Sequence, residues 1–256
     1  MKIGCITWSH RLENLDLFAL MDHYKNDCHL DGIELWNNSF SSTDDEYLQK
    51  LKEKSDELSL PIYSVASKCQ FGDFSDAKIE ECRKTLVKWL DITKKLGASI
   101  LRISIAGDDL RNPDNQDKVF KTLTDTLNET PHEGIRVGIE NQEPGVVQNS
   151  TDVKRMVEKS NGQLFVVLDN GSFLDRKTSP YAFMEDNLKY ACVVHTKFFD
   201  INSDGSDNVL DYSRIKSIID KSGYDGYLSI EYDNSSASAI KDVPLIADFM
   251  RKTFKE

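Results

Sequence analysis

Cysteine is scarce in this sequence, and the few cysteines form no motif. The 256 residues contain five, an odd number, and no pair has the Cys-x-x-Cys spacing: Cys5, Cys28, Cys69, Cys82 and Cys192. Scattered cysteines of this kind argue against a disulfide framework and against a zinc knuckle. We expect them to be small, buried side chains in a protein of a reducing compartment.

Long apolar runs are also missing. The sequence has no stretch of about 18 consecutive apolar residues, which is the length that a helix needs to cross a bilayer. The apolar run near the amino terminus is interrupted by polar residues and is too short for the core of a signal peptide. The sequence therefore predicts a cytoplasmic protein with no membrane insertion.

Positive charge is in deficit. The chain has 32 basic residues against 43 acidic ones, so its formal net charge at pH 7 is −11. A field of this sign repels the phosphates of nucleic acids and anionic lipid headgroups. We therefore expect no nucleic-acid partner and no membrane partner.

Glycine motifs that bind nucleotides are absent, and the chain has only 13 glycines and 6 prolines. Neither Gly-x-Gly-x-x-Gly nor Gly-x-x-x-x-Gly-Lys-Ser/Thr occurs. No segment rich in proline, glycine or serine divides the chain, and 39% of the residues are hydrophobic, which is typical of a packed globular protein. We interpret residues 1–256 as one domain.

Short runs rich in β-branched residues alternate with longer amphipathic stretches. The runs predict eight strands, at residues 2–7, 32–36, 62–66, 100–105, 135–140, 164–168, 192–197 and 227–231. The stretches predict eight helices, at residues 15–24, 44–57, 76–96, 114–127, 151–159, 181–190, 212–221 and 243–254. Strict alternation requires a parallel sheet, because parallel neighbours need long crossovers. Eight units of about 30 residues favour an α/β fold, a single (β/α)8 TIM barrel, over an open doubly wound sheet.

Polar side chains end four successive strands in the second half of the chain. Apolar residues precede each of them, and they are Glu140, Asp169, His195 and Glu231. The active site of a TIM barrel lies at the carboxyl ends of its strands, so we expect these side chains to converge. Three carboxylates buried together raise one another's pKa, and a divalent cation removes that cost. The pattern therefore predicts a metal site, with a buried ion-pair network as the alternative.

The ligand types indicate which metal ion to expect. Three oxygen donors and one nitrogen suit Mn²⁺ or Mg²⁺ best, and Co²⁺ or Zn²⁺ are alternatives. No cysteine joins the set, which disfavours metals that prefer thiolates. We expect one divalent metal ion.

Five motifs resemble those of the xylose isomerase-like TIM barrels, over essentially the full length of the chain. They are Gly-Ile-Glu-Leu-Trp at 32–36, Ile-Glu-Asn at 139–141, Leu-Asp-Asn-Gly at 168–171, His-Thr-Lys at 195–197 and Gly-Tyr-Asp-Gly-Tyr-Leu-Ser-Ile-Glu at 223–231. This superfamily includes sugar and sugar-phosphate isomerases and epimerases, and repair enzymes of the endonuclease IV type. The resemblance implies that Glu140, Asp169, His195 and Glu231 bind one divalent metal ion and that both glutamates are catalytic and move protons.

The reaction that the resemblance implies is isomerisation or epimerisation of a small-molecule sugar or sugar phosphate. A proton is removed from the carbon next to a carbonyl group, and the metal ion stabilises the resulting enediolate as a Lewis acid. Related epimerases often have a histidine three residues after the metal-binding aspartate, where this chain has Ser172. This departure leaves open the orientation of the substrate and the choice between isomerase, epimerase and dehydratase.

Six further residues are candidates for substrate binding. They lie on the strands or close to the strand ends, and they are Trp8, His10, Glu34, Trp36, Arg102 and Lys197. The two tryptophans could stack on a sugar ring, although packing alone would also explain them. His10 and Glu34 could bind sugar hydroxyl groups or take part in ion pairs.

Arg102 and Lys197 differ from the other candidates because both carry a positive charge. Arg102 lies inside an apolar strand, so we expect it to pair with a carboxylate such as Glu34 or Glu140, with substrate binding as the minority interpretation. Lys197 shares a strand face with His195, and the two resemble the His-x-Lys pair of the family.

Two other functions remain as alternatives. An endonuclease IV-like phosphodiesterase needs many histidines for several zinc ions, whereas this chain has five, with only His10 and His195 near strand ends. A sugar-binding barrel without catalysis would not need the paired acid and base that Glu140 and Glu231 supply. The absence of a phosphate-binding glycine loop slightly favours an unphosphorylated or carboxylated substrate. A homo-oligomer is also possible, because barrels of this type often pair.

Overall fold

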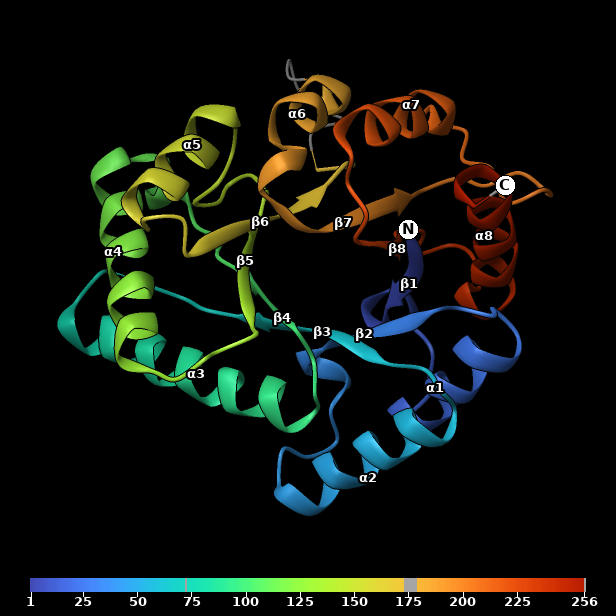
Figure 1. The fold of residues 1–256 in the computed structure, drawn as a ribbon, viewed down its shortest axis with the longest axis horizontal. Coiled ribbons are helices and arrows are strands. Elements are labelled where there is room, and N and C mark those ends of the chain that lie inside the picture. Colours follow the sequence, from blue (N-terminus) through green and yellow to red (C-terminus); the bar gives the residue numbers. More distant parts are fainter. Residues whose placement is uncertain (72, 173–178, 256) are drawn as a thin grey trace.

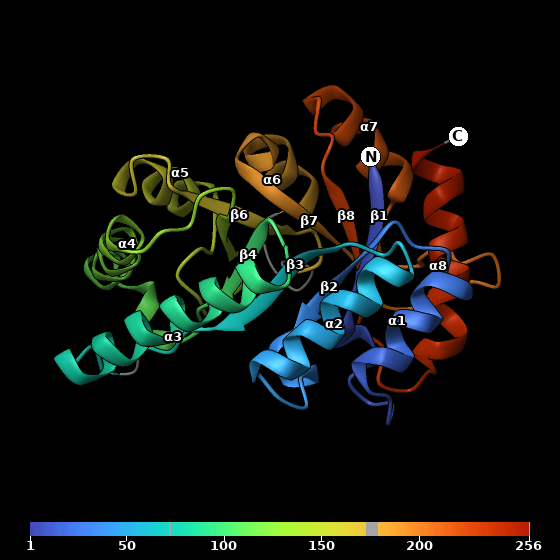
Figure 2. The same cartoon turned by 60° about the horizontal axis from the view of Figure 1, so that its bottom comes forward.

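The computed structural model describes residues 1–71, 73–172 and 179–255, which form eight strands and eight α-helices in alternation (Figure 1). Each strand pairs in parallel with the next, and β8 pairs in parallel with β1, so that the sheet closes. The helices surround this closed sheet, and successive helices such as α1, α2 and α3 lie side by side (Figure 2). The predicted α/β fold, a single (β/α)8 TIM barrel, is confirmed.

The strands are β1 (Lys2–Ile6), β2 (Gly32–Trp36), β3 (Ile62–Lys68), β4 (Ile100–Ser104), β5 (Arg136–Glu140), β6 (Leu164–Asp169), β7 (Ala191–Phe198) and β8 (Tyr227–Tyr232). The helices are α1 (Leu17–Asn26), α2 (Asp45–Glu57), α3 (Asp76–Lys95), α4 (Pro113–Glu129), α5 (Ser150–Lys159), α6 (Pro180–Asn187), α7 (Tyr212–Ser222) and α8 (Ala239–Phe254). Four short 3-10 helices, η1 (Thr7–His10), η2 (Asn37–Ser39), η3 (Asp108–Arg111) and η4 (Leu188–Tyr190), complete the described secondary structure. None of the described helices is long and apolar enough to cross a membrane.

Two elements differ from the predicted bounds in an informative way. The strand predicted to end at residue 66 continues as β3 to Lys68, which adds a charged residue at its carboxyl end. The helix predicted from residue 243 begins at Ala239, with Pro244 inside it. The backbone N–H of Ile240 donates to the Glu13 carboxylate at 3.0 Å. A side chain near the amino terminus of the chain thus caps the first turn of the last helix, α8. A cap of this kind is invisible to local sequence patterns.

The apolar core has two parts. The larger part fills the space between the sheet and the helices, and the smaller part includes Tyr63, Val167 and Val193. Val167 precedes Asp169 by two residues, and Val193 precedes His195 by two, so each pair shares one face of its strand. This face points into the barrel. The smaller cluster therefore forms an apolar floor beneath the polar strand ends.

Gly138 in β5 leaves room for this floor. A Cβ atom at that position would lie 2.4 Å from the sulfur of Cys192 and 2.8 Å from a methyl group of Val167. We expect Gly138→Ala to lower the free energy of unfolding by about 1–3 kcal/mol through overpacking, measured by urea denaturation.

The additional substitution Cys192→Ala tests this cause, because it removes the closest atom. The double variant should regain part of the lost stability relative to Gly138→Ala. If the double variant instead loses as much free energy of unfolding as the two single variants together, crowding against Cys192 is not the cause of the destabilisation.

Candidate metal centre

Four side chains meet at the carboxyl ends of β5, β6, β7 and β8. Each of Glu140, Asp169, His195 and Glu231 is buried and offers a ligand atom, and these atoms all lie within 4.8 Å of one another. We call these residues the candidate metal cluster. Strand register explains their proximity, because Asp169 is the partner of His195 across the β6–β7 pair. The structure thus brings together all four residues that the sequence predicted to converge.

The imidazole of His195 lies between carboxylates on both sides. Its Nδ1 atom is 2.7 Å from Glu231 Oε2 and 3.3 Å from Glu140 Oε1. Its Nε2 atom is 3.1 Å from Glu34 Oε2, on the side away from the cluster. When Nε2 carries the proton and donates to Glu34, the lone pair of Nδ1 is free to bind a cation.

Glu34 is held in place for this contact. Ser229 Oγ donates to its Oε2 at 2.8 Å, and Ser64 Oγ donates to its Oε1 at 3.1 Å. The side chain is fully buried, so it is inaccessible to a substrate in the cavity. The geometry places Glu34 as the carboxylate that orients His195, a common arrangement behind metal-binding histidines.

Asp169 is oriented by the backbone around it. Its Oδ1 accepts hydrogen bonds from the N–H groups of Gly171 at 2.6 Å and Ser172 at 3.1 Å. The side chain of Asn141 bonds the backbone of Asp169 in both directions, at 2.8 and 2.9 Å. The other carboxylate oxygen, Oδ2, is thereby turned towards Lys197. Sequence reasoning missed this role of Asn141, although it directly follows Glu140.

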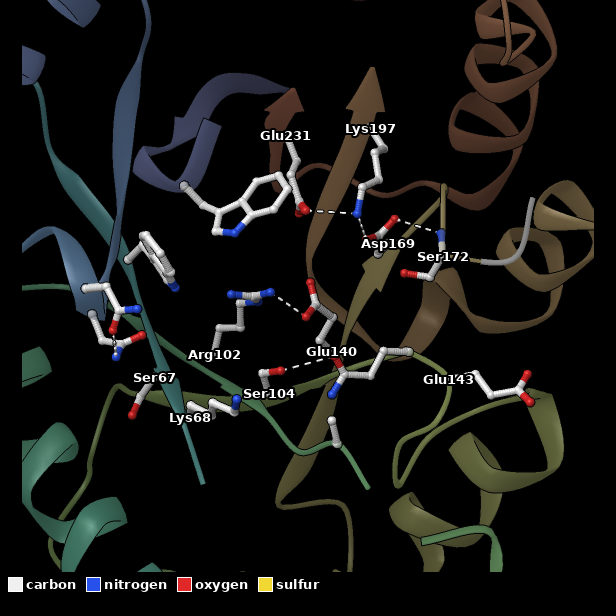
Figure 3. Close-up of a pocket in the computed structure, with 16 residues that line it drawn as sticks. Ser67, Lys68, Arg102, Ser104, Glu140, Glu143, Asp169, Ser172, Lys197 and Glu231 are labelled. Atoms are coloured by element: carbon white, nitrogen blue, oxygen red, sulfur yellow. Dashed lines mark hydrogen bonds and ion pairs between the residues drawn. The ribbon is translucent and has the colours of Figure 1, made fainter. Parts of the chain in front are cut away.

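Two basic residues compensate the buried negative charge. Lys197 Nζ lies 2.9 Å from Glu231 Oε1 and 3.2 Å from Asp169 Oδ2, and Arg102 pairs with Glu140 (Figure 3). Of the two carboxylates considered as partners of Arg102, Glu140 is the one that it contacts. Removal of either basic side chain would leave a buried charge uncompensated, which is strongly destabilising.

The charges shift the protonation of the cluster in opposite directions. Burial alone would raise the pKa of Glu231, but the Lys197 ammonium and His195 outweigh it and hold that pKa well below its usual value. At Asp169 burial prevails over Lys197, and the pKa is raised. Burial would lower the pKa of His195, but Glu34, Glu140 and Glu231 raise it well above its usual value.

The donor set fits a divalent cation. Oxygen and nitrogen ligands bind such ions at about 2.0–2.2 Å, so two ligands on opposite sides of an ion are about 4–4.4 Å apart. A spread of up to 4.8 Å therefore closes around one ion with small side-chain movements. A cation would replace the proton of His195 as the charge that faces the carboxylates. The candidate metal cluster is the only group of three or more potential metal ligands in the part of the chain described here. A phosphodiesterase site of the endonuclease IV type would need ligands for several zinc ions.

A cavity of about 440 Å³ opens above the cluster, a volume in the range of small-molecule sites. Four of the predicted substrate residues contribute to its wall: Trp8, Trp36, Arg102 and Lys197. Two cations contact the ring of Trp8: the Arg11 guanidinium is 3.5 Å and the Lys197 ammonium 5.6 Å from a ring centroid. These cation–π contacts fix the indole as a rigid face of the cavity.

His10 does not reach the cavity. It belongs to η1, where the chain turns outward after β1, and its Nδ1 is 3.0 Å from the hydroxyl of Tyr24 in α1. Its ring also packs edge-on against His23. His10 thus lies in the layer between barrel and helices, outside contact with a substrate in the described cavity. The sequence predicted the first strand over residues 2–7 but did not predict the 3-10 turn that moves His10 away from the strand end.

Several residues of the cavity wall were not predicted from the sequence. They include Asn37, Asn38, Ser67, Lys68, Ser104 and Gln142. Lys68 and Ser104 are the last residues of β3 and β4, so the rule that polar strand ends form the site applies to them as well. Lys68 was missed because the strand was predicted to end two residues earlier.

Comparison with known proteins gives matches over nearly the whole chain. Residues 26–253 match the family described as xylose isomerase-like TIM barrel. No curated protein sequence matches the chain.

Several solved structures share the fold. D-psicose 3-epimerase from Clostridium cellulolyticum H10, solved with D-tagatose, aligns with a TM-score of 0.81 and 12% identity over 99% of both chains. L-ribulose 3-epimerase aligns at 0.79 with 14% identity, over 99% of this chain and 94% of that chain. The IOLI protein, solved with a zinc atom, aligns at 0.79 with 14% identity, over 100% of this chain and 98% of that chain.

Metal binding should stabilise the folded protein. Because the ligands converge only in the folded state, Mn²⁺ at about 100 times its Kd should raise the free energy of unfolding by about 2.7 kcal/mol. Asp169→Asn, which removes one charged ligand, should weaken Mn²⁺ binding in calorimetric titration, whereas Glu46→Gln on the exposed side of α2 should not. Absence of any heat or stabilisation with Mn²⁺, Mg²⁺, Co²⁺ and Zn²⁺ would rule out the metal site.

His10 should make stability depend on pH. Burial, aided by the charge of His23, lowers its pKa from 6.5 to about 3, so below pH 6.5 the unfolded chain takes up a proton that the folded protein does not. Stability is therefore lost as the pH falls, by about 2 kcal/mol between pH 7 and pH 5. In urea denaturation at both pH values, His10→Gln should show a correspondingly smaller drop than the wild type. An equal drop in both proteins would contradict the buried neutral state of His10.

Proposed function

The chain belongs to the xylose isomerase-like TIM barrel family, and from this premise we propose that it is a divalent-metal-dependent isomerase or epimerase of a sugar or sugar phosphate. One observation carries the proposal: Glu140 and Glu231 come from different strands and approach the same atom, His195 Nδ1, at 3.3 and 2.7 Å. Two carboxylates beside one metal ligand are suited to move protons to and from a substrate held there. The shared fold of two ketose 3-epimerases is consistent with this chemistry.

The bound metal ion would supply Lewis-acid stabilisation of the negative charge that develops on the substrate after proton removal. The protein supplies the bases. Burial favours protonation of Glu140 and Glu231, but Arg102 and Lys197 oppose it and lower both pKa values. Both carboxylates are therefore ionised at neutral pH, and each can accept a proton from a C–H group next to a carbonyl.

The number of bases engaged distinguishes the two reactions. An epimerisation needs one group to accept the proton on one face of the carbon and another to return a proton on the opposite face. An isomerisation can use a single carboxylate that moves the proton between adjacent carbons on one face. The presence of Glu140 and Glu231 on β5 and β8 supports the two-base epimerisation.

The remaining wall residues would bind and orient the sugar. Trp8 and Trp36 offer flat apolar surfaces for the C–H faces of a sugar ring or chain. Lys197 and Arg102 present donors to hydroxyl or carbonyl oxygens beside the two bases. The Ser172 hydroxyl also lines the cavity and can accept or donate one hydrogen bond to the substrate.

Solvent exchange tests the reaction. In D₂O the Mn²⁺-loaded protein should incorporate deuterium next to the carbonyl of at least one compound in a panel of ketoses and ketose phosphates, followed by loss of the C–H signal in proton NMR. Glu231→Gln removes one base and should slow exchange by about 10²–10⁴-fold without loss of the fold.

Glu185→Gln provides the matched control, because Glu185 is an exposed carboxylate on α6 away from the cavity. It should exchange like the wild type. Exchange by Glu231→Gln at the wild-type rate, or no exchange by the wild type with any compound, would overturn the proposal.

A further inference from the structure

The part of the cavity wall formed by β3, β4 and the residue pair after β5 carries donors that have no partner within the described residues. Ser67 and Lys68 at the end of β3 lie across the cavity from Asp169 and Lys197 (Figure 3). No hydrogen bond or ion pair involves the Lys68 ammonium within the described residues, although basic side chains elsewhere in the cavity are paired. Lys68 is thus a cation in a binding cavity that no carboxylate of the described residues neutralises.

Three buried donors accompany Lys68, and one of them is the hydroxyl group of Ser67. The other two are the Nε atom of Arg102 and the Nε2 atom of Gln142, and none of the three has a hydrogen-bond partner in the part of the chain that the structure describes. Ser104 Oγ donates to Gln142 Oε1 at 3.1 Å, which leaves the amide nitrogen as the free end of that side chain. A buried donor without an acceptor is costly, so such groups in a cavity indicate an acceptor that arrives with a ligand.

Charge balance points to the same kind of ligand. The candidate metal cluster and Glu34 supply four carboxylates. Arg102, Lys197 and Lys68 supply three positive charges to the same cavity and its floor. When a divalent cation is bound and His195 is neutral, one positive charge remains uncompensated. A ligand with one negative charge would balance it.

One further acidic residue of the cavity wall does not change the balance. Glu143 lines the cavity, and its carboxylate lies 3.7 Å from the Arg111 guanidinium, which offsets its charge. Lys68 Nζ, Arg102 Nε and Gln142 Nε2 therefore have no protein acceptor among the described residues, although another nitrogen of Arg102 pairs with Glu140.

We propose that the substrate carries an anionic group, a carboxylate or a phosphate, that binds to Lys68, Arg102 Nε and Gln142 Nε2 while its reacting carbons lie at the candidate metal cluster. The substrate class is then a sugar acid or a sugar phosphate in place of a neutral sugar. This inference rests on the proposed function for the identity of the reacting end, but the anion subsite itself is defined by residues outside the cluster.

Binding of matched probes tests the subsite. D-gluconate, D-glucitol 6-phosphate and neutral D-glucitol share a six-carbon polyol chain, and each is titrated calorimetrically into the Mn²⁺-loaded protein. At least one anionic probe should bind more tightly than D-glucitol, and which one does identifies the anion. In Lys68→Met that probe should bind about 10- to 100-fold more weakly, while D-glucitol binding stays unchanged.

Two further variants sharpen the test. Gln142→Glu replaces a free donor with a negative charge and should weaken the same anionic probe while keeping the shape of the side chain. Lys154→Met, at an exposed position of α5 outside the cavity, also removes one positive charge and should bind all probes like the wild type. Equal affinity for charged and neutral probes, no binding of either anion, or unchanged anion affinity in Lys68→Met would each overturn the subsite.

The outcomes separate this inference from the proposed reaction. Deuterium exchange with a ketose phosphate or a keto sugar acid at a rate that Lys68→Met does not alter would keep the reaction and overturn the anion subsite. Anion binding that depends on Lys68, without exchange in any compound, would support the subsite and overturn the reaction.

Discussion

The structure depends on how four buried carboxylates are compensated within one small volume. Glu34, Glu140, Asp169 and Glu231 are all buried, and an isolated buried carboxylate would cost several kcal/mol of desolvation. His195 compensates from the centre, since its two ring nitrogens face carboxylates of β2, β5 and β8. Pairs of this kind seldom add net stability over apolar residues, so their presence here is better explained by function.

Closure of the barrel makes this arrangement available. Glu34 and His195 are 161 residues apart in the chain, and they meet because β7 and β2 face the same interior from different sides. The register then sets the height of each side chain along the axis: Lys197 is opposite Glu231, and Asp169 is opposite His195. A shift of one residue in any of these pairs would turn a charged side chain into the apolar shell beneath the helices.

Sequence patterns predicted the parts of the site that depend on strand alternation. Glu140, Asp169, His195 and Glu231 each end an apolar run, and parallel strands bring such ends together. The patterns did not predict the location of a side chain where it depends on the exact end of a strand or on how deeply the side chain is buried. His10 follows a turn that carries it behind the barrel, Lys68 lies on an extension of β3, and the burial of Glu34 depends on the serines of β3 and β8.

The basic residues of the cavity therefore have two roles that depend on what the cluster holds. Without a metal ion, Lys197 and Arg102 are the counterions of Glu231, Asp169 and Glu140, and their donors are directed at those carboxylates. A divalent cation at the cluster would take over this compensation, because it brings two charges to the same oxygens. Lys197 and Arg102 could then donate hydrogen bonds to substrate oxygens. In this way, occupation of the metal site and the ability to bind a substrate become linked through the same three carboxylates.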